Sequence, residues 1–493
     1  MRINPFVRLA SVCAPLVLAD LLAAADAPSA PAPTPRESNQ RKAAECYARD
    51  SKAYGSNTNF LVRPGLLADR SARRVVIHAE SIHLQAGSPA EFLLIDESSG
   101  KDYEALAVSF AKPSAVHEAL VFIGLPPGIG VDPSKFRFWP KGERVRIEFR
   151  YEGKTPGDPL SPPIQAGQLV IDTRTGKTLP DTGFVFTGSS WVTLPGQPAS
   201  NRAYAADTFS PNSIVAVYNE PVTVLDVPRR AAQHEVYSYQ VPNPDTPIPS
   251  ARFTEVTLTP DNMDGRLRVC DLTLNLKPHM TALPGGAPLL YVLREQDRQL
   301  TTNTSPEGLL AALADLTGHQ RDAFVKVVPD DELPLAALRG AAALIDTLDS
   351  SQSMRVEPPP AGHPYYRCFL PDDKHRERAG RPVQPWELYL GKSAGAPTGE
   401  LVLVEEDWQG GDSKPTYRET RFSAPTPEIL AHRLKREDVP SVVLVFAPSD
   451  LRYGEFRKFV APILERGMIL YVFLPRATPA GQGNPPADAV RAP

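Results

Sequence analysis

Apolar and polar residues alternate in short runs through the first half of the chain. The run ERVRIEFRYEG places Val145, Ile147 and Phe149 on one face, the period of two expected of a half-buried strand. RRVVIHAESIHLQ alternates more loosely, and EFLLI is a compact apolar run typical of a strand packed on both faces. Further strands are expected at 168–172, 183–186, 213–218 and 255–258. The pattern predicts a β-rich domain over residues 42–280.

The same region contains one clear helical period. Val116, Leu120 and Ile123 recur at helical spacing, and Pro113 stands near the start of the run. Proline is favoured in the first helical turn because the amide that it lacks would have no helical partner there. We therefore predict a helix over residues 112–124.

The last third of the chain contains an internal repeat, at residues 305–348 and 426–474. Each copy begins with Ser/Thr-Pro-Glu, in which a helix-capping residue precedes proline at the first helical position. Each continues with an amphipathic helix, an apolar strand, a charged turn and a second amphipathic helix, and an apolar strand precedes each copy. We predict two small α/β modules of β-α-β-α-β order, over 287–357 and 385–475. The fold class is therefore mixed α+β and multidomain.

The first residues have the order of an export signal peptide. Arg2 and Arg8 form a basic start, an apolar stretch follows, and small residues come next. A retained membrane anchor is the alternative, but Pro15 and Asp20 interrupt a stretch already shorter than the ~20 residues needed to cross a bilayer. We predict that residues 1–25 are a signal peptide. The protein is then exported to the periplasm or envelope, with no transmembrane span in the mature chain.

Composition adds two points. The 493 residues carry a net charge of −4, which gives no electrostatic reason to expect nucleic acid as a partner. Proline, at 53 residues, is about twice as frequent as usual. Stretches rich in proline predict a disordered spacer at 26–41, a connector at 358–384 and a disordered tail at 476–493.

No complete catalytic or cofactor motif is present. Cys46, Cys270 and Cys368 lack the CxxC spacing of a metal site, and their disulfide status stays open. The Gly-Ile-Gly at 128–130 is not followed by a helix signature, so it does not indicate dinucleotide binding. We predict no metal, no cofactor and no catalytic residue.

Several segments occur in the order found in the YdjY-type domain, a bacterial family of poorly defined biochemistry. They are EFLLIDESSGKDYEALAVSFAKPSAVHEALVFIGLPPG, GFVFTGSSW, AYAAD and SIVAVYNEPVTVLDVP. Residues 63–260 therefore resemble this family, which implies a β-rich domain but no particular reaction. Ser189 and Asp207 lie in these segments, and they are candidates either for ligand contact or for capping turns.

Lys101, Glu104 and His117 form the best candidate site. The first two follow a strand end and His117 lies on the predicted helix, so the three converge if that helix folds back over the strand. A carboxylate and an imidazole can bind a metal or transfer a proton. The alternative is an ion pair and a structural histidine. Tyr103 stands where the YdjY-type pattern has a histidine, which removes one ligand from any such site.

The two predicted modules resemble the periplasmic domain of the ExbD/TolR family. The family turn Asp-x-x-Val-Pro-Tyr is approximated at 330–335, and the second copy keeps Leu451 and Tyr453 at 448–453. The membrane helix of that family, with its proton-carrying aspartate, does not stand directly before either copy. The resemblance thus implies the domain shape and a binding habit, but no proton-driven motor.

We expect an exported bacterial envelope protein that binds or scaffolds without catalysis, through its ExbD/TolR-like modules. A protein partner in the envelope is expected, and homo-oligomerisation is possible through exposed strand edges. The alternative is a metal-binding or hydrolytic protein that uses Glu104 and His117. A third interpretation is a diverged component of an energised transport complex.

Overall fold

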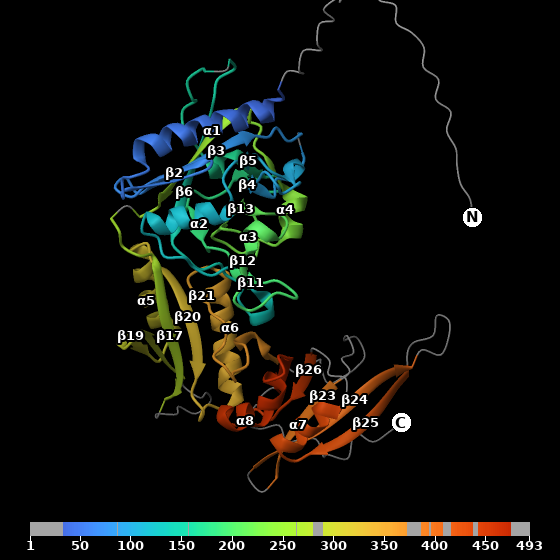
Figure 1. Ribbon diagram of the computed structural model, residues 1–493. Helices are drawn as coiled ribbons and strands as arrows, with labels where there is room; N and C mark the ends of the chain where they lie inside the picture. The colour runs from blue at the N-terminus through green and yellow to red at the C-terminus, as the bar shows by residue number, and fades with distance from the viewer. Residues whose placement is uncertain are drawn as a thin grey trace, which may run out of the picture.

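The computed structural model shows a mixed α/β protein in which a barrel-like sheet is followed by two smaller sheets (Figure 1). The residues that it describes are 33–85, 87–155, 157–262, 264–279, 289–371, 386–393, 396–407, 416–436 and 442–474. The predicted signal peptide and tail lie outside the described residues. Within the described ranges, each helix is too short or too polar to span a bilayer.

The first sheet closes on itself because β3 pairs with both β16 and β5. In ring order the closed strands are β3 (Arg74–Ser81), β16 (Phe253–Pro260), β6 (Arg144–Tyr151), β10 (Phe184–Phe186), β14 (Leu225–Asp226), β13 (Ser213–Ala216), β4 (Phe92–Asp96) and β5 (Ala107–Ser109). Closure leaves these strands without a free edge. A hairpin of β1 (Phe60–Arg63) and β2 (Leu66–Asp69) continues the sheet outward from β3, and β7 (Ile164–Gln165) pairs with β6.

Short helices, 3-10 turns and small sheets lie between the barrel strands in the chain. The helices are α2 (Pro113–Phe122), α3 (Ala205–Thr208) and α4 (Gln233–Tyr239), and the 3-10 turns are η1 (Asp102–Glu104), η2 (Pro133–Lys135) and η3 (Ala166–Leu169). A hairpin is formed by β11 (Trp191–Thr193) and β12 (Arg202–Tyr204), and a small sheet by β15 (Gln240–Pro242), β8 (Val170–Asp172) and β9 (Lys177–Thr178). The helix predicted over 112–124 is α2.

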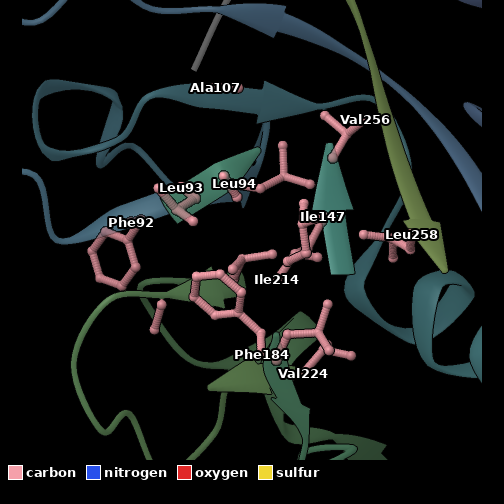
Figure 2. Close-up of a cluster of buried hydrophobic side chains, with 14 of the residues drawn as sticks. Phe92, Leu93, Leu94, Ala107, Ile147, Phe184, Ile214, Val224, Val256 and Leu258 are labelled. Carbon is pink, nitrogen blue, oxygen red and sulfur yellow. The ribbon is translucent and has the colours of Figure 1, made fainter. Parts of the chain in front are cut away.

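The alternating residues of the barrel strands form its core. Val145, Ile147 and Phe149, the predicted inward face of β6, are all buried. Figure 2 shows Ile147 among side chains from β4, β13 and β16, including Leu94 and Leu258. Burying such aliphatic side chains contributes about 1.5–3 kcal/mol each, so the strand pattern sets the position of this core.

A long helix, α1 (Pro35–Tyr54), lies across the barrel (Figure 1). Thr34 caps it, because its side chain accepts from the Glu37 amide while the Glu37 carboxylate accepts from the Thr34 amide. Arg36 pairs with buried Glu80 of β3 at 2.6 Å, which fixes the helix to the sheet. The predicted spacer at 26–41 is thus helical from Pro35 onward, since this capping box outweighs the Ala/Pro-rich composition that precedes it.

The last two sheets have the same connectivity, and we call their chain segments the first copy (269–356) and the second copy (386–474). The first copy consists of β17 (Val269–Pro278), β18 (Leu289–Glu295), β19 (Arg298–Asn303), α5 (Pro306–Gly318), β20 (Asp322–Pro329), α6 (Leu335–Ser350) and β21 (Arg355–Val356). The second consists of β23 (Trp386–Ser393), β24 (Ala396–Asp407), β25 (Thr416–Ala424), α7 (Pro427–Arg436), β26 (Val442–Phe446), α8 (Tyr453–Leu464) and β27 (Ile469–Leu474). The strands of the two copies are ordered β19-β18-β17-β20-β21 and β25-β24-β23-β26-β27, and the second sheet continues beyond β27 with β22 (Phe369–Pro371).

Two predicted boundaries differ from this arrangement. Three strands precede the first helix of each copy, where the sequence predicted one. β17 pairs in parallel with β20, so it belongs to the first copy although the predicted β-rich domain ran to residue 280. A strand's partner is set by contacts distant in sequence, which periodicity does not report.

The predicted connector at 358–384 is partly ordered. Its described part contains η4 (Tyr366–Cys368) and β22 (Phe369–Pro371), and β22 pairs with β27 of the second copy. Tyr365 stacks on Phe136 of the barrel with ring centroids 5.0 Å apart. The aromatic side chains of this Pro-rich stretch therefore hold it against its neighbours.

The two copies meet through the loops that precede α6 and α8, in a reciprocal arrangement. The amide of Leu335 donates to the carbonyl of Leu451 at 2.9 Å. At the equivalent position, the amide of Tyr453 donates to the carbonyl of Leu333 at 2.7 Å. Leu333 and Leu451 are both buried, and one hydrophobic cluster contains residues of both copies. The copies therefore form one pseudo-symmetric body with a shared core.

Side-chain charges at this junction distinguish the two copies. Acidic side chains of the first-copy loop face arginines of the second copy: Arg452 pairs with Glu332 at 2.6 Å, and Arg457 of α8 pairs with Asp331 at 3.1 Å. Each exposed pair contributes about 0.2–1 kcal/mol. Pairing two identical copies would instead place like charges together, so the charges favour the unlike pairing.

Two buried carboxylates join the first copy to the barrel. Asp349 of α6 accepts from the Trp139 indole at 2.7 Å and from Arg230, both on the barrel side. Asp322 of β20 accepts from Arg144 of β6 at 2.9 Å, and Arg355 lies 3.1 Å away.

Neighbouring charges and burial have opposite effects on the pKa of Asp322, in the cluster that it forms with Arg144 and Arg355. Burial lowers the pKa of Arg144 to about 10. Burial alone would raise the pKa of the Asp322 carboxyl, but the neighbouring charges of Arg144 and Arg355 outweigh it and hold that pKa below its ordinary value.

The reciprocal junction predicts coupled losses of stability. Leu333→Ala and Leu451→Ala should each lower the free energy of unfolding by about 2–5 kcal/mol, because each leaves a cavity in the shared core. In urea unfolding, the double variant should deviate from the sum of the single variants by about 0.5–3 kcal/mol. The control pair, Leu333→Ala with Leu66→Ala of the barrel core, should be additive. Additivity of both pairs would contradict the shared core.

The lowered pKa of Asp322 predicts a stability loss in acid. Its ionised form stabilises the fold at pH values above its ordinary pKa of 3.8, and this contribution disappears as the pH falls through the lower folded value. Asp322→Asn should cost about 3–5 kcal/mol at neutral pH, since Arg144 loses its counter-charge. Below about pH 4 its unfolding midpoint should fall less steeply than that of the unsubstituted chain. Asp315→Asn, at an exposed site on α5, is the control, and equal slopes for all three proteins would refute the assignment.

Candidate functional site

A groove of about 820 Å³ opens on the barrel beside α2. It lies between the β1–β2 turn, the turn after β4, the end of β5, α2 and the start of β11. Its lining consists of Arg63, Pro64, Asp96, Glu97, Ser98, Phe110, Lys112, Ser114, Ala115, His117, Glu118, Val121 and Trp191. Of the five predicted site residues, His117 is the one that lines this groove.

His117 is held by a backbone carbonyl. Its Nδ1 lies 2.9 Å from the oxygen of Gly188, and because a carbonyl only accepts, Nδ1 carries the proton in this contact. Nε2 is then the nitrogen with a free lone pair. Burial lowers the pKa of His117 from its ordinary 6.5, although the hydrogen bond to Gly188 opposes that shift. The ring is therefore neutral at pH 7, and its Nε2 can accept a hydrogen bond.

Gly188 is required at this position by its conformation and by its neighbours. Its φ is +75°, in the left-handed region that favours glycine. A Cβ there would lie 2.9 Å from Pro127 and 3.2 Å from the His117 ring. The absence of a side chain at Gly188 is thus what allows the imidazole to approach the carbonyl.

Tyr204 completes the support of the histidine. Its hydroxyl donates to the same Gly188 carbonyl at 2.9 Å, and its ring meets the His117 ring edge-on at 5.4 Å. The Tyr204 ring also meets the Trp191 ring edge-on, with centroids 5.3 Å apart. Burial raises the pKa of Tyr204, so its hydroxyl stays protonated and remains a donor. The contacts form a chain from Trp191 to His117.

Ser189 and Asp207 lie beside this network. Ser189 follows Gly188 with φ +51°, and its hydroxyl is buried near that of Tyr204. Asp207 accepts from the Ser114 amide at 2.9 Å and so caps the first turn of α2. Asp207 therefore positions the helix that carries His117.

Lys101 and Glu104 have different neighbours. Lys101 Nζ lies 3.4 Å from Glu104 Oε2 and donates to the Tyr103 hydroxyl at 2.8 Å. Neither lines the groove, so the structure does not bring Glu104 and His117 together there. Among the described residues, no three His, Cys, Asp or Glu side chains are arranged to hold a metal ion.

The acidic side chains at the groove already have polar partners. Glu118 forms a two-point pair with Arg63, at 2.6 and 2.9 Å. Asp96 accepts from the Ser98 amide at 2.8 Å, and Glu97 accepts from Gln40 of α1 at 2.7 Å. The groove thus carries one ion pair, two carboxylates held by uncharged partners, and the Lys112 ammonium.

Sequence reasoning missed Gly188, Tyr204 and Trp191 as site residues. Gly188 and Trp191 lie in the segment GFVFTGSSW, which also contains Ser189, and Tyr204 lies in AYAAD, which also contains Asp207. The detectable signal was a glycine directly before a candidate residue, which often marks a backbone conformation that other residues avoid. The contact of these segments with α2 depends on the barrel closure and has no local signal.

Comparison with known proteins adds no family to these observations. No family model matches the chain, and no curated protein matches it significantly. The resemblances to the YdjY-type domain and to ExbD/TolR remain predictions from the sequence.

Substitution of Gly188 should displace His117. Gly188→Ala is expected to lower the free energy of unfolding by about 1–3 kcal/mol and to raise the pKa of His117 toward 6.5, as the ring leaves its buried contact. Gly196→Ala is the matched control, because Gly196 has φ +76° and a Cβ added there would meet no atom within 4 Å, so it adds strain without contact. NMR titration of the imidazole measures both variants. Equal His117 pKa values in the two would contradict the role of Gly188.

Proposed function

We propose that this chain is an exported envelope protein that binds a protein partner through its two ExbD/TolR-like modules, without catalysing a reaction. The feature that supports this most is β25, the last strand of the second-copy sheet. It is a nine-residue strand that pairs on one side with β24, and almost all of its residues are exposed. A strand of this kind can add a partner strand by backbone hydrogen bonding.

Charged side chains along β25 limit which strands can pair with it. Arg418 pairs with Glu405 at 2.6 Å and Arg421 with Glu400 at 2.8 Å, both across to β24. Charged side chains on an edge discourage indiscriminate pairing, so a partner strand must match them. The same edge of another molecule of this protein is an alternative occupant, and such pairing would produce a homo-oligomer.

The hydrolytic or metal-binding alternative has less support. It required Glu104 and His117 in one cleft, whereas Glu104 contacts Lys101 and His117 contacts Gly188. The third interpretation, a component of an energised transport complex, would require stable association with an inner-membrane assembly. Both alternatives lack an observation of their own among the described residues.

Two adjacent proline substitutions test the edge. Neighbouring amides of a strand point in opposite directions, so one of Thr420 and Arg421 donates to β24 and the other faces outward. One of the two variants, Thr420→Pro or Arg421→Pro, removes the outward amide. The thermal unfolding midpoint of that variant should stay within a few degrees of that of the unsubstituted chain. That variant should also lose the partner, because proline removes the donor and blocks strand addition.

The readout is affinity purification from the envelope fraction together with the mass of the purified protein by light scattering. The unsubstituted chain and Tyr237→Ala, an exposed change on the barrel, should recover the same partner or the same oligomer. Retention of the partner by both correctly folded proline variants would exclude β25 as the binding edge.

A further inference from the structure

The groove on the barrel has the properties of a ligand site separate from the β25 edge. Its volume of about 820 Å³ lies within the range of about 300–1,000 Å³ typical of small-molecule sites. Its walls come from rigid elements, since β1, β4 and β5 belong to the barrel sheet and α2 is capped by Asp207. The groove therefore exists before any ligand binds, which reduces the entropy cost of binding.

The electrostatics of the groove favour an uncharged ligand. Arg63 and Glu118 neutralise one another, while the carboxylates of Asp96 and Glu97 and the ammonium of Lys112 place charges of both signs along the same groove. A strongly charged ligand would have to compete with this pair or meet an opposing charge beside its partner. Hydroxyl and amide groups, in contrast, can both donate to carboxylates and accept from cations without displacing them.

An aromatic platform forms one wall. Trp191 is 49% exposed, and the edge-on contact with Tyr204 fixes its orientation. Val121 of α2 is also exposed and lines the same groove. An exposed, immobilised indole presents an apolar face with little entropy to lose, which suits the C–H face of a pyranose ring.

His117 supplies a directed polar group. Because the Nδ1 proton is donated to the Gly188 carbonyl, Nε2 has a free lone pair and can accept a hydrogen bond from a ligand hydroxyl. Lys112 and Ser114 lie on the same helix and line the same groove, and both can donate. An apolar face and alternating donors and acceptors are the complement of a sugar.

We propose that this groove binds an uncharged saccharide, with one ring stacked on Trp191 and a hydroxyl donating to His117 Nε2. The site is independent of partner binding at β25. No bond is made or broken in this proposal.

The test titrates the full purified chain with short cello-, malto- and chito-oligosaccharides. At least one series should shift the His117 Nε2 resonance and change the fluorescence of Trp191. Trp191→Ala should weaken that binding at least about tenfold, equivalent to about 1.4 kcal/mol, while Trp191→Phe retains most of it. Tyr237→Ala, which removes an exposed aromatic side chain elsewhere on the barrel, should bind as the unsubstituted chain does.

The variants also separate this proposal from the proposed function. Trp191→Ala should keep the partner recovered through β25, and the proline variants of β25 should keep saccharide binding. Failure of all three sugar series, equal binding by Trp191→Ala, or tighter binding of a short peptide or of inorganic phosphate would overturn the saccharide assignment.

Discussion

The fully buried carboxylate of Asp349 connects three parts of the chain. It accepts from Trp139 and Arg230 of the barrel, from Tyr366 after the first copy, and from the amide of Val356 in β21. A buried charge of this kind is tolerated only while every partner is present, since removal of a partner costs about 3–5 kcal/mol. The position of the first copy against the barrel therefore depends on a small set of hydrogen bonds. The second copy is placed in turn by the reciprocal loops at Leu333 and Leu451.

The sequence predicted what is local. The inward face of β6, the helix begun by Pro113 and the repeated Ser/Thr-Pro-Glu starts all correspond to observed elements, because two- and 3.6-residue periods and helix caps are properties of neighbouring residues. It did not predict that β5 closes the barrel against β3 or that β17 joins β20, because strand partners depend on distant contacts. The candidate site follows the same division. His117 was named from its place on the predicted helix and Asp207 from a segment that resembles the YdjY-type family, whereas the separation of Glu104 and the support from Gly188 required the closed barrel.

The two proposed binding surfaces differ in kind. The groove beside α2 has rigid walls formed by the barrel. At one side of it, the Gly188 carbonyl holds His117 and Tyr204 together. The β25 edge offers backbone groups and a charge pattern, and it lies in the part of the molecule built from two similar copies. Opposite side-chain charges at the junction favour the pairing of the two copies with each other. We propose one ligand on the barrel and one protein partner at the far sheet.

The most direct test of this account is a double-mutant cycle between Trp139 and Asp349, measured by urea unfolding of the full chain. Trp139→Phe removes the donor and Asp349→Ala the acceptor of the same hydrogen bond. We expect a coupling energy of about 0.5–3 kcal/mol and a single unfolding transition of the unsubstituted chain in which the barrel and the first copy unfold together. Strict additivity, together with separate transitions for the two parts, would contradict the claim that this buried carboxylate joins them.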